Sequence, residues 1–184
     1  MYYINAKKWY EGDFSEGNRH GKGIEYYEND NSILYYINAK KMYEGDWSDD
    51  KRHGKGISYY DNGNNTKKYE GDFSEGKRQG KGIEYHENGN KGYDGSWSDD
   101  NWHGKGIEYY KNGKKWYEGE WSEGNRHGQG IEYYKNGNKM YEGDYSEGKR
   151  HGQGIEYYDN DNNTKEYEGD YSENKRHGKG IKYY

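Results

Sequence analysis

The sequence contains no cysteine and no proline among its 184 residues, and aliphatic side chains are scarce. Without cysteine, disulfide bonds and thiol chemistry are excluded, and the composition is compatible with a reducing compartment. No run of about 18 apolar residues occurs, and no charged segment leads into an apolar one. We therefore expect neither a membrane span nor a signal peptide. The expected location is cytoplasmic, with peripheral attachment to a membrane or to the cytoskeleton left open.

The composition is too polar for a conventional two-layer core. Only 27% of the residues are hydrophobic, and the mean hydropathy is -1.80. Such polarity would indicate disorder, but 26 Tyr and 6 Trp are too many aromatics for a disordered chain. The net charge of -5 weakly repels nucleic acid, which we do not expect as a partner. We expect aromatic side chains to stack along an array of repeated units.

Seven copies of one segment of roughly two dozen residues fill nearly the whole chain, and 117–140 is a clear example. In every copy a Gly follows the opening Tyr by two places, a large aromatic follows it by four, and a Gly-x-Gly-Ile segment comes later. The opening tyrosines are Tyr10, Tyr43, Tyr69, Tyr93, Tyr117, Tyr141 and Tyr167. We predict a single repeat array over 1–184, with an insertion at 28–36 in the first copy.

Each copy has the pattern of two short strands. Alternation of period two places Tyr10, Gly12 and Phe14 on one face of the first strand. A polar turn separates it from a second strand at 20–27, and the two form an antiparallel hairpin. Asn-Gly in the connections between copies favours a type I′ turn and hence a further hairpin. The predicted fold is all-β, an elongated single-layer antiparallel meander of consecutive β-hairpins.

The recurring glycines and the recurring isoleucine bear on which face is packed. Glycine in a strand costs roughly 0.5–1 kcal/mol relative to alanine, so we expect Gly12, Gly21, Gly23 and their counterparts to leave room for aromatic rings. The register leaves open whether Ile24 or Tyr27 shares the face of the packed aromatics. We expect the isoleucine, the only regular aliphatic, to face the core.

The string Tyr-Glu-Gly-x-aromatic-x-x-Gly-x-x-His-Gly-x-Gly, as at 117–130, resembles the MORN repeat (membrane occupation and recognition nexus). The resemblance covers essentially the whole chain, although Gln79 replaces the motif His in the third copy. It implies an elongated sheet of consecutive hairpins without catalysis of its own. It also implies a scaffold or protein-binding module in cytoskeletal or membrane-associated settings, and some such arrays have been proposed to bind phosphoinositides.

Catalytic and metal chemistry find little support in the sequence. Ser15 and His20 have counterparts in copy after copy, which is typical of turn and strand residues and not of a nucleophilic triad. Equivalent histidines in adjacent copies are expected roughly 10 Å apart, two strand spacings, which is too far for direct zinc coordination. We expect no catalytic residue, no metal site and no cofactor.

Basic pairs at one turn position form the first candidate binding surface. They are Lys51, Arg52, Lys77, Arg78, Lys149, Arg150, Lys175 and Arg176. A basic line along one sheet edge could bind inositol phosphates or an acidic partner. The alternative is that acidic residues a few places earlier neutralise it; these are Glu16, Asp49, Glu75, Glu147 and Glu173.

Large aromatics form the second candidate surface: Trp47, Trp97, Trp102, Trp121 and Tyr145. Trp102 replaces the usual Arg in the fourth copy, and it either anchors a partner or packs on a neighbour. Neither end of the array has a helix or proline to cap a sheet edge, which favours a homo-oligomer through the sheet ends. We predict a non-enzymatic scaffold with a protein partner. The alternative is a peripheral membrane module that binds phosphoinositides.

Overall fold

A computed structural model describes residues 8–27, 40–160 and 162–184. The insertion predicted at 28–36 lies outside these residues. The contacts group the chain into two compact units, Met1–Gly89 and Asn90–Tyr184. We call them unit 1 and unit 2, and we describe each by itself.

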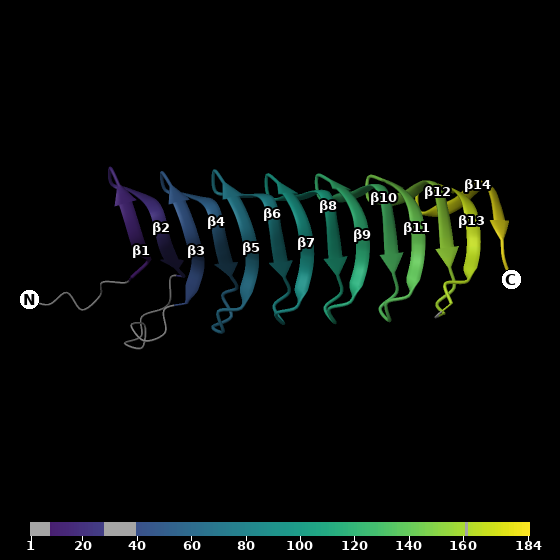
Figure 1. Ribbon diagram of the computed structural model, residues 1–184, viewed down its shortest axis with the longest axis horizontal. Coiled ribbons are helices and arrows are strands. Elements are labelled where there is room, and N and C mark those ends of the chain that lie inside the picture. Colours follow the sequence, from purple (N-terminus) through teal and green to yellow (C-terminus); the bar gives the residue numbers. More distant parts are fainter. Residues whose placement is uncertain (1–7, 28–39, 161) are drawn as a thin grey trace, which may run out of the picture. The chain divides into compact units, whose positions relative to one another are not determined.

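The described residues form strands joined by turns and contain no helix (Figure 1). Unit 1 contains β1 (Tyr10–Ser15), β2 (Asn18–Tyr26), β3 (Lys41–Ser48), β4 (Lys51–Tyr59), β5 (Lys67–Ser74) and β6 (Lys77–Tyr85). Unit 2 contains β7 (Lys91–Ser98), β8 (Asn101–Tyr109), β9 (Lys115–Ser122), β10 (Asn125–Tyr133), β11 (Lys139–Ser146), β12 (Lys149–Tyr157), β13 (Lys165–Ser172) and β14 (Lys175–Lys182). In both units each strand pairs antiparallel with the next in chain order. The predicted all-β meander of consecutive hairpins is confirmed.

The turn between the two strands of each copy is a tight two-residue turn. Its two central residues both have positive φ, as in Glu123 (50°) and Gly124 (80°), which is the signature of a type I′ turn. The same turn is built from Asp99 and Asp100 in the fourth copy. Because this turn matches the right-handed twist of the paired strands, it fixes the register of each hairpin.

The connection between copies is a hairpin, but the predicted type I′ turn at Asn-Gly is wrong. Only Gly113 has positive φ there (83°). The backbone N–H of Gly113 donates to the Tyr110 carbonyl (2.8 Å), and that of Tyr110 donates to the Lys114 carbonyl (2.9 Å). Asn112 accepts a hydrogen bond from the Lys114 N–H through its side chain (3.0 Å). Asn112 therefore contributes a side-chain turn, and glycine alone supplies the left-handed residue.

The strand register assigns the two faces of the sheet. Within a hairpin Tyr117 lies opposite Glu132 and Gly119 opposite Gly130, whereas Ile131 lies opposite Glu118. Residues directly opposite share a face, so Ile131 is on the face that lacks the opening Tyr. The expectation that the isoleucine faces the core is wrong. The recurring isoleucines are half-buried on the reverse side, which we call the Ile face, except for exposed Ile181.

The opposite face is bent around its own side chains. Four residues of extended strand span about 13 Å, yet the rings of Tyr117 and Trp121 are 5.0 Å apart. The Tyr43 hydroxyl donates to the carbonyl of Asp46, three residues later (3.0 Å). Both contacts require the strand to curl toward this side. We call it the concave face, and the curved strands are visible in Figure 1.

Glycine makes this bend possible for two separate reasons. A Cβ added at Gly119 or Gly130 would collide with the ring of Tyr117, so the paired glycines form the surface on which that ring lies. Gly128, by contrast, has φ of 58° in the two-residue bulge between His127 and Gly130. The prediction that glycines make room for rings is confirmed for the Gly12 and Gly23 positions. At Gly21 the reason is the backbone conformation (φ 65°).

Within each unit the core is a row of edge-to-face aromatic rings. Tyr117 packs against Trp121 of its own copy and against Tyr145 of the next, at 5.0 and 5.1 Å between centroids. The opening tyrosines Tyr43, Tyr69, Tyr93, Tyr117 and Tyr141 are at most 1% exposed. Edge-to-face pairs are worth about 0.5–1.5 kcal/mol each beyond the buried area. Each copy therefore stabilises its neighbour.

We predict that Gly130→Ala destabilises the fold by about 3 kcal/mol, because the added methyl meets the buried Tyr117 ring. Gly137→Ala is the matched control. Its φ of 99° is strained for alanine, but it lies in an open turn, so about 1 kcal/mol is expected. Urea unfolding followed by tyrosine fluorescence measures both. Equal losses at the two sites would contradict the assignment of Gly130 to the ring surface.

Stability should fall steeply in alkali. Burial raises the pKa of Tyr43, Tyr93, Tyr117 and Tyr141 above the usual 10, and burial with a hydrogen bond to Glu44 raises that of Tyr59 to about 12. Between pH 10 and these values the unfolded chain loses phenolic protons that the folded chain keeps. The buried tyrosines therefore make their full contribution to the free energy of unfolding below pH 10, and this contribution declines above pH 10.

Each such tyrosine contributes a slope of about 1.4 kcal/mol per pH unit. Thermal unfolding monitored between pH 8 and 11, with phenolate absorbance recorded in parallel, tests this. An unchanged melting temperature up to pH 11, or full phenolate formation near pH 10 in the folded protein, would show that the tyrosines are not sequestered.

Candidate functional site

The concave face of unit 2 carries alternating Arg and Glu side chains above the aromatic core. Arg150 Nε donates to Glu132 (3.0 Å) and its Nη1 donates to Glu156 (2.6 Å). Arg126 bonds Glu132 and also Glu108, the latter at 3.1 Å. Arg126 and Arg150 thus each bridge the Glu of their own copy and that of the preceding copy, whereas Arg176 pairs with Glu156 and Glu166. We call this row the Arg–Glu ladder; in unit 2 it comprises Glu108, Arg126, Glu132, Arg150, Glu156 and Arg176.

Unit 1 carries a similar row with a gap. Arg19 pairs with Glu25 (2.8 Å), and Arg52 reaches back to the same carboxylate (2.9 Å). Arg78 pairs with Glu84 (2.7 Å). The position between Arg52 and Arg78 is Ser58, where most other copies have Glu. The repeat thus contains its own natural substitution of a ladder carboxylate.

The ladder arginines also cover the opening tyrosines. The guanidinium carbon of Arg126 lies 4.6 Å from the Tyr117 ring centroid, and that of Arg150 lies 4.4 Å from Tyr141. Burial alone would lower the pKa of Arg150, but the Glu132 carboxylate outweighs this effect and the pKa is raised. The guanidinium therefore stays charged, with both an aromatic ring and carboxylates as partners.

The predicted basic edge is divided between two places. Successive residues of a strand point to opposite sides, so each Arg of a Lys-Arg pair enters the ladder while its Lys stays at the turn. Lys51 pairs with Glu75, and Lys149 with Glu173, each in the following copy. Arg52, Arg78, Arg150 and Arg176 lie in the concave face. Lys77 and Lys175 lie at the equivalent turn positions, which are exposed.

A continuous basic line formed by these eight residues is therefore wrong, because half of them are paired inside the concave face. The alternative, neutralisation by acidic residues, matches the pairs formed by Lys51 and Lys149. The neutralising carboxylates come from the next copy along the sheet and not from the same turn.

The predicted aromatic contact surface is mostly core. Trp47, Trp97, Trp121 and Tyr145 are only 3–4% exposed, because the neighbouring rings and the ladder arginines cover them. A partner could touch these four side chains only if the sheet opened. The structure assigns them to packing between copies, which corrects their interpretation as docking residues.

Trp102 occupies the ladder position of an arginine. Its ring stacks on Tyr93 with 4.4 Å between centroids and 4° between planes, and Trp121 meets it edge-on at 4.8 Å. An indole thus replaces the guanidinium that covers the opening Tyr in the other copies. Of the two interpretations of Trp102, packing on neighbours fits this geometry.

Sequence reasoning missed the most exposed aromatic of the interior copies. Trp116 is 37% exposed, stacks on Tyr110 with 5.4 Å between centroids, and lies 4.7 Å from the guanidinium carbon of Arg126. It is on the concave face beside the ladder, and half-buried Met140 holds the equivalent position one copy further along. The sequence signal that could have identified Trp116 is variability at its position. The residue before the opening Tyr differs from copy to copy, as expected of a position that the fold does not constrain.

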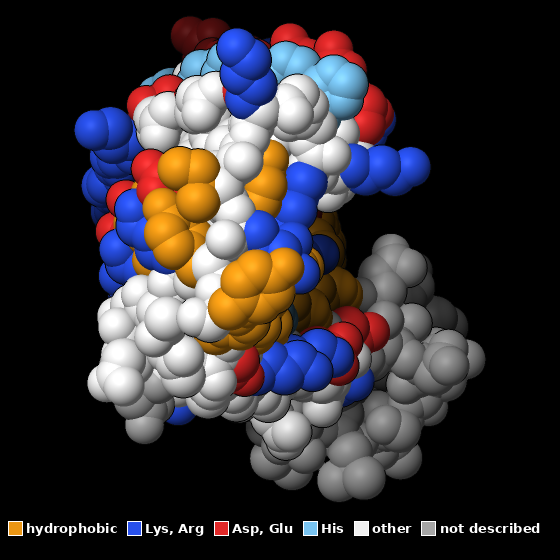
Figure 2. All heavy atoms as spheres, turned by 90° about the vertical axis from the view of Figure 1, so that its right-hand side faces the viewer, with side chains coloured by type: hydrophobic (Ala, Val, Ile, Leu, Met, Phe, Trp, Pro, Cys, Tyr) orange, Lys and Arg blue, Asp and Glu red, His pale blue; other side chains and the backbone are white. Residues whose placement is uncertain are grey.

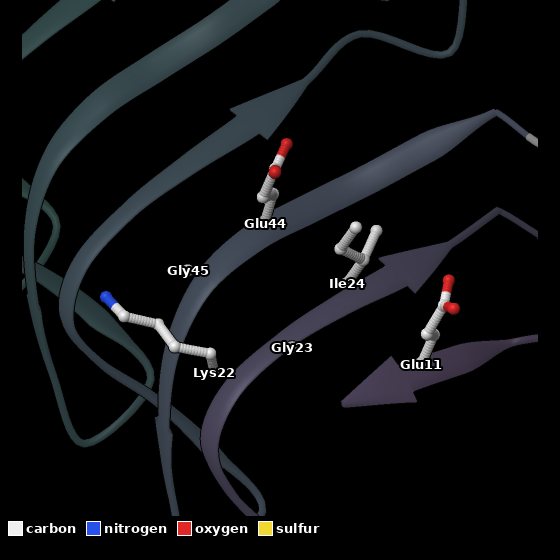
Figure 3. Close-up of a pocket in the computed structure, with 6 residues that line it drawn as sticks. All are labelled: Glu11, Lys22, Gly23, Ile24, Glu44 and Gly45. Carbon is white, nitrogen blue, oxygen red and sulfur yellow. The ribbon is translucent and has the colours of Figure 1, made fainter. Parts of the chain in front are cut away.

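The Ile face of unit 1 contains a shallow pocket of about 400 Å³ between β1, β2 and β3. Glu11, Ile24 and Glu44 line it side by side, with Lys22 to one side of them (Figure 3). Both carboxylates already have partners. Glu44 pairs with Lys41 at 2.7 Å, and Glu11 pairs with Lys8. The third charged residue, Lys22, pairs with Asp46, so the charges that line the pocket are already balanced.

Comparison with known families now decides the identity of the repeat. The sequence profile of the MORN repeat matches residues 10–32, 43–65, 69–91, 93–115, 117–139, 141–162 and 167–184. The chain belongs to the MORN repeat family. A search of curated proteins finds no significant match. In this MORN array the motif Tyr, the two paired Gly and the motif aromatic build the core, and the Arg between turn and bulge builds the ladder.

Within the described ranges, no helix is long and apolar enough to cross a membrane. In the same part of the chain, no group of three or more His, Asp or Glu side chains is arranged to hold a metal ion. The MORN histidines instead occupy exposed positions near the start of the second strand in every copy except the third, which has Gln79 there.

We predict that Glu132→Ala costs about 3 kcal/mol, because it leaves the buried guanidinium groups of Arg126 and Arg150 with one carboxylate fewer. Ser58→Ala at the equivalent position of unit 1 is the control, and a change below about 1 kcal/mol is expected there. Urea unfolding measures both variants. A loss at Glu132 no larger than that at Ser58 would contradict a stabilising ladder.

Proposed function

We propose that this MORN array is a non-enzymatic scaffold whose concave face in unit 2 holds a protein segment. One observation carries the proposal: exposed Trp116 stacks on half-buried Tyr110 on a face whose charges are otherwise mutually neutralised. Exposed Trp and Tyr side chains dominate the energetics of many protein interfaces. The segment bound there presents apolar side chains to the indole of Trp116.

The charge pattern favours a protein over a phosphoinositide headgroup. The guanidinium of Arg150 already donates hydrogen bonds to Glu132 and Glu156. A phosphate group could bind this guanidinium only by displacing one of the two carboxylates. Exchanging one buried ion pair for another brings little net gain. At the turns, Lys51 and Lys149 are also paired with carboxylates. The proposed scaffold is cytoplasmic, with attachment to membrane or cytoskeleton through its protein partner.

Site-specific crosslinking tests the proposed surface. A photoreactive phenylalanine analogue placed at Trp116 in the full chain should capture protein in native extract. The same analogue at Ile131, on the Ile face of the same hairpin, is the matched control and should capture at least about tenfold less. Equal capture at both positions would refute a docking site on the concave face.

Trp116→Ala separates docking from stability. Because the side chain is exposed, we expect its loss to change the free energy of unfolding by less than about 1 kcal/mol. Binding of the crosslinked partner, once identified, should weaken at least about tenfold. Binding of the protein to vesicles with and without phosphoinositide tests the alternative, a membrane module. Binding that rises with phosphoinositide content and survives Trp116→Ala would contradict the scaffold and support a membrane module.

A further inference from the structure

The outermost strands, β1 and β14, each pair with a single neighbour among the described strands. Edges of this kind accept an added strand. Large apolar side chains are exposed at both edges, with Phe14 60% and Ile181 59% exposed. Figure 2 faces the β14 end and shows hydrophobic side chains reaching the surface among Lys and Arg side chains.

These two edges are the two halves of a junction that recurs inside each unit. At every such junction the second strand of one copy meets the first strand of the next in one register, as β2 and β3 place Gly21 opposite Trp47. β14 is a second strand and β1 is a first strand. The same register between two molecules places Gly178 of one opposite Phe14 of the other.

Charges at the two edges match those of the internal junction. Lys22 of β2 forms an ion pair with Asp46 of β3. The corresponding residues of the open edges are Lys179 on β14 and Asp13 on β1, again of opposite sign. Each would lie where its internal counterpart finds a partner.

A second charge match occurs at the turns. Lys149 pairs with Glu173, which lies one copy further along. The equivalent residue of β14 is Lys175, and the equivalent acceptor beside β1 is Glu16. Two independent pairs of opposite charge thus favour the contact of β14 with β1 over a contact of either edge with itself.

The aromatic row is also interrupted at these edges. At internal junctions the opening Tyr covers the motif aromatic of the next copy, as Tyr43 covers Phe73 with 5.2 Å between centroids. Phe73 is consequently 5% exposed, whereas Phe14 is 60% exposed. Among the described residues, Tyr167, the opening Tyr beside β14, packs edge-on against Tyr171 of its own copy and meets no motif aromatic on the far side of β14. In the register above, its ring lies over Phe14 of the second molecule.

One position departs from the pattern. Most internal second strands have Glu at the ladder position and β4 has Ser58, but β14 has Lys182 there. In the joined register it lies beside Arg19 of the second molecule. Like charges at adjacent positions are unfavourable, so this residue weakens the contact without changing its geometry.

We propose that the protein associates with a second copy of itself head to tail, with β14 of one molecule adding to β1 of the next. The contact is heterologous, since it uses two different surfaces, and it can therefore continue into chains of molecules. It is independent of the Trp116 surface, and it requires only purified protein to be observed.

Sedimentation velocity over a range of concentrations is the first test, with an average mass that rises as concentration rises. The head-blocked variant is Phe14→Asp, a change at an exposed side chain. The tail-blocked variant is the double charge reversal Lys175→Glu and Lys179→Glu. The control reverses two exposed loop lysines, Lys111→Glu and Lys135→Glu, with the same change in net charge.

Each blocked variant alone should remain monomeric, while the control associates as the unmodified protein does. A mixture of the two blocked variants retains one intact head and one intact tail, so it should form dimers in a 1:1 ratio and nothing larger. Association of either blocked variant alone, or no dimer in the mixture, would overturn the head-to-tail arrangement. Monomers of the unmodified protein at all concentrations would also overturn it.

Lys182→Glu gives a test in the opposite direction. It restores the carboxylate that internal junctions place beside the following Arg, and it should tighten self-association by about tenfold. Circular dichroism checks that the fold is unchanged. Weaker or unchanged association of the folded variant would contradict the proposed register.

Discussion

The fit of a tyrosine ring onto two paired glycines is the constraint on which this array depends. The Tyr117 ring rests where Gly119 and Gly130 face each other, and no side chain larger than hydrogen leaves room for it. A single sheet has no second layer to bury its face, so burial must come from curling the strands over their own rings. The bulge at Gly128 permits that curl. The aromatic row and the Arg–Glu ladder follow from the concave surface that results.

This arrangement explains how a chain with so few aliphatic residues forms a buried core. Tyrosine supplies the apolar area, and its hydroxyl donates to a backbone carbonyl within the same strand, as Tyr43 does to Asp46. Arginine then covers the ring with a guanidinium that is paired on either side. The charged residues that make the sequence look disordered are therefore part of the packing, and each copy is stabilised by its neighbours.

Much of the fold could be predicted because it is local. The alternation around Tyr10, Gly12 and Phe14 predicts a strand, and its repetition with short links predicts a meander. The face of Ile24 could not be predicted, because register depends on a two-residue bulge that has no distinct sequence signal. For the same reason the candidate site was largely missed. In the sequence the Lys-Arg pairs resemble one basic edge. In the structure the strand places each Arg in the concave face and leaves each Lys at the turn.

Ring currents provide the most direct measurement of the central claim. Protons held against the face of an aromatic ring resonate upfield, so the NMR signals of the Gly119 and Gly130 α-protons should be shifted upfield and should show nuclear Overhauser contacts to the Tyr117 ring. The turn residue Gly124, with no ring near it, should resonate at ordinary positions. Unshifted α-protons at Gly119 and Gly130, without contacts to the Tyr117 ring, would contradict the account.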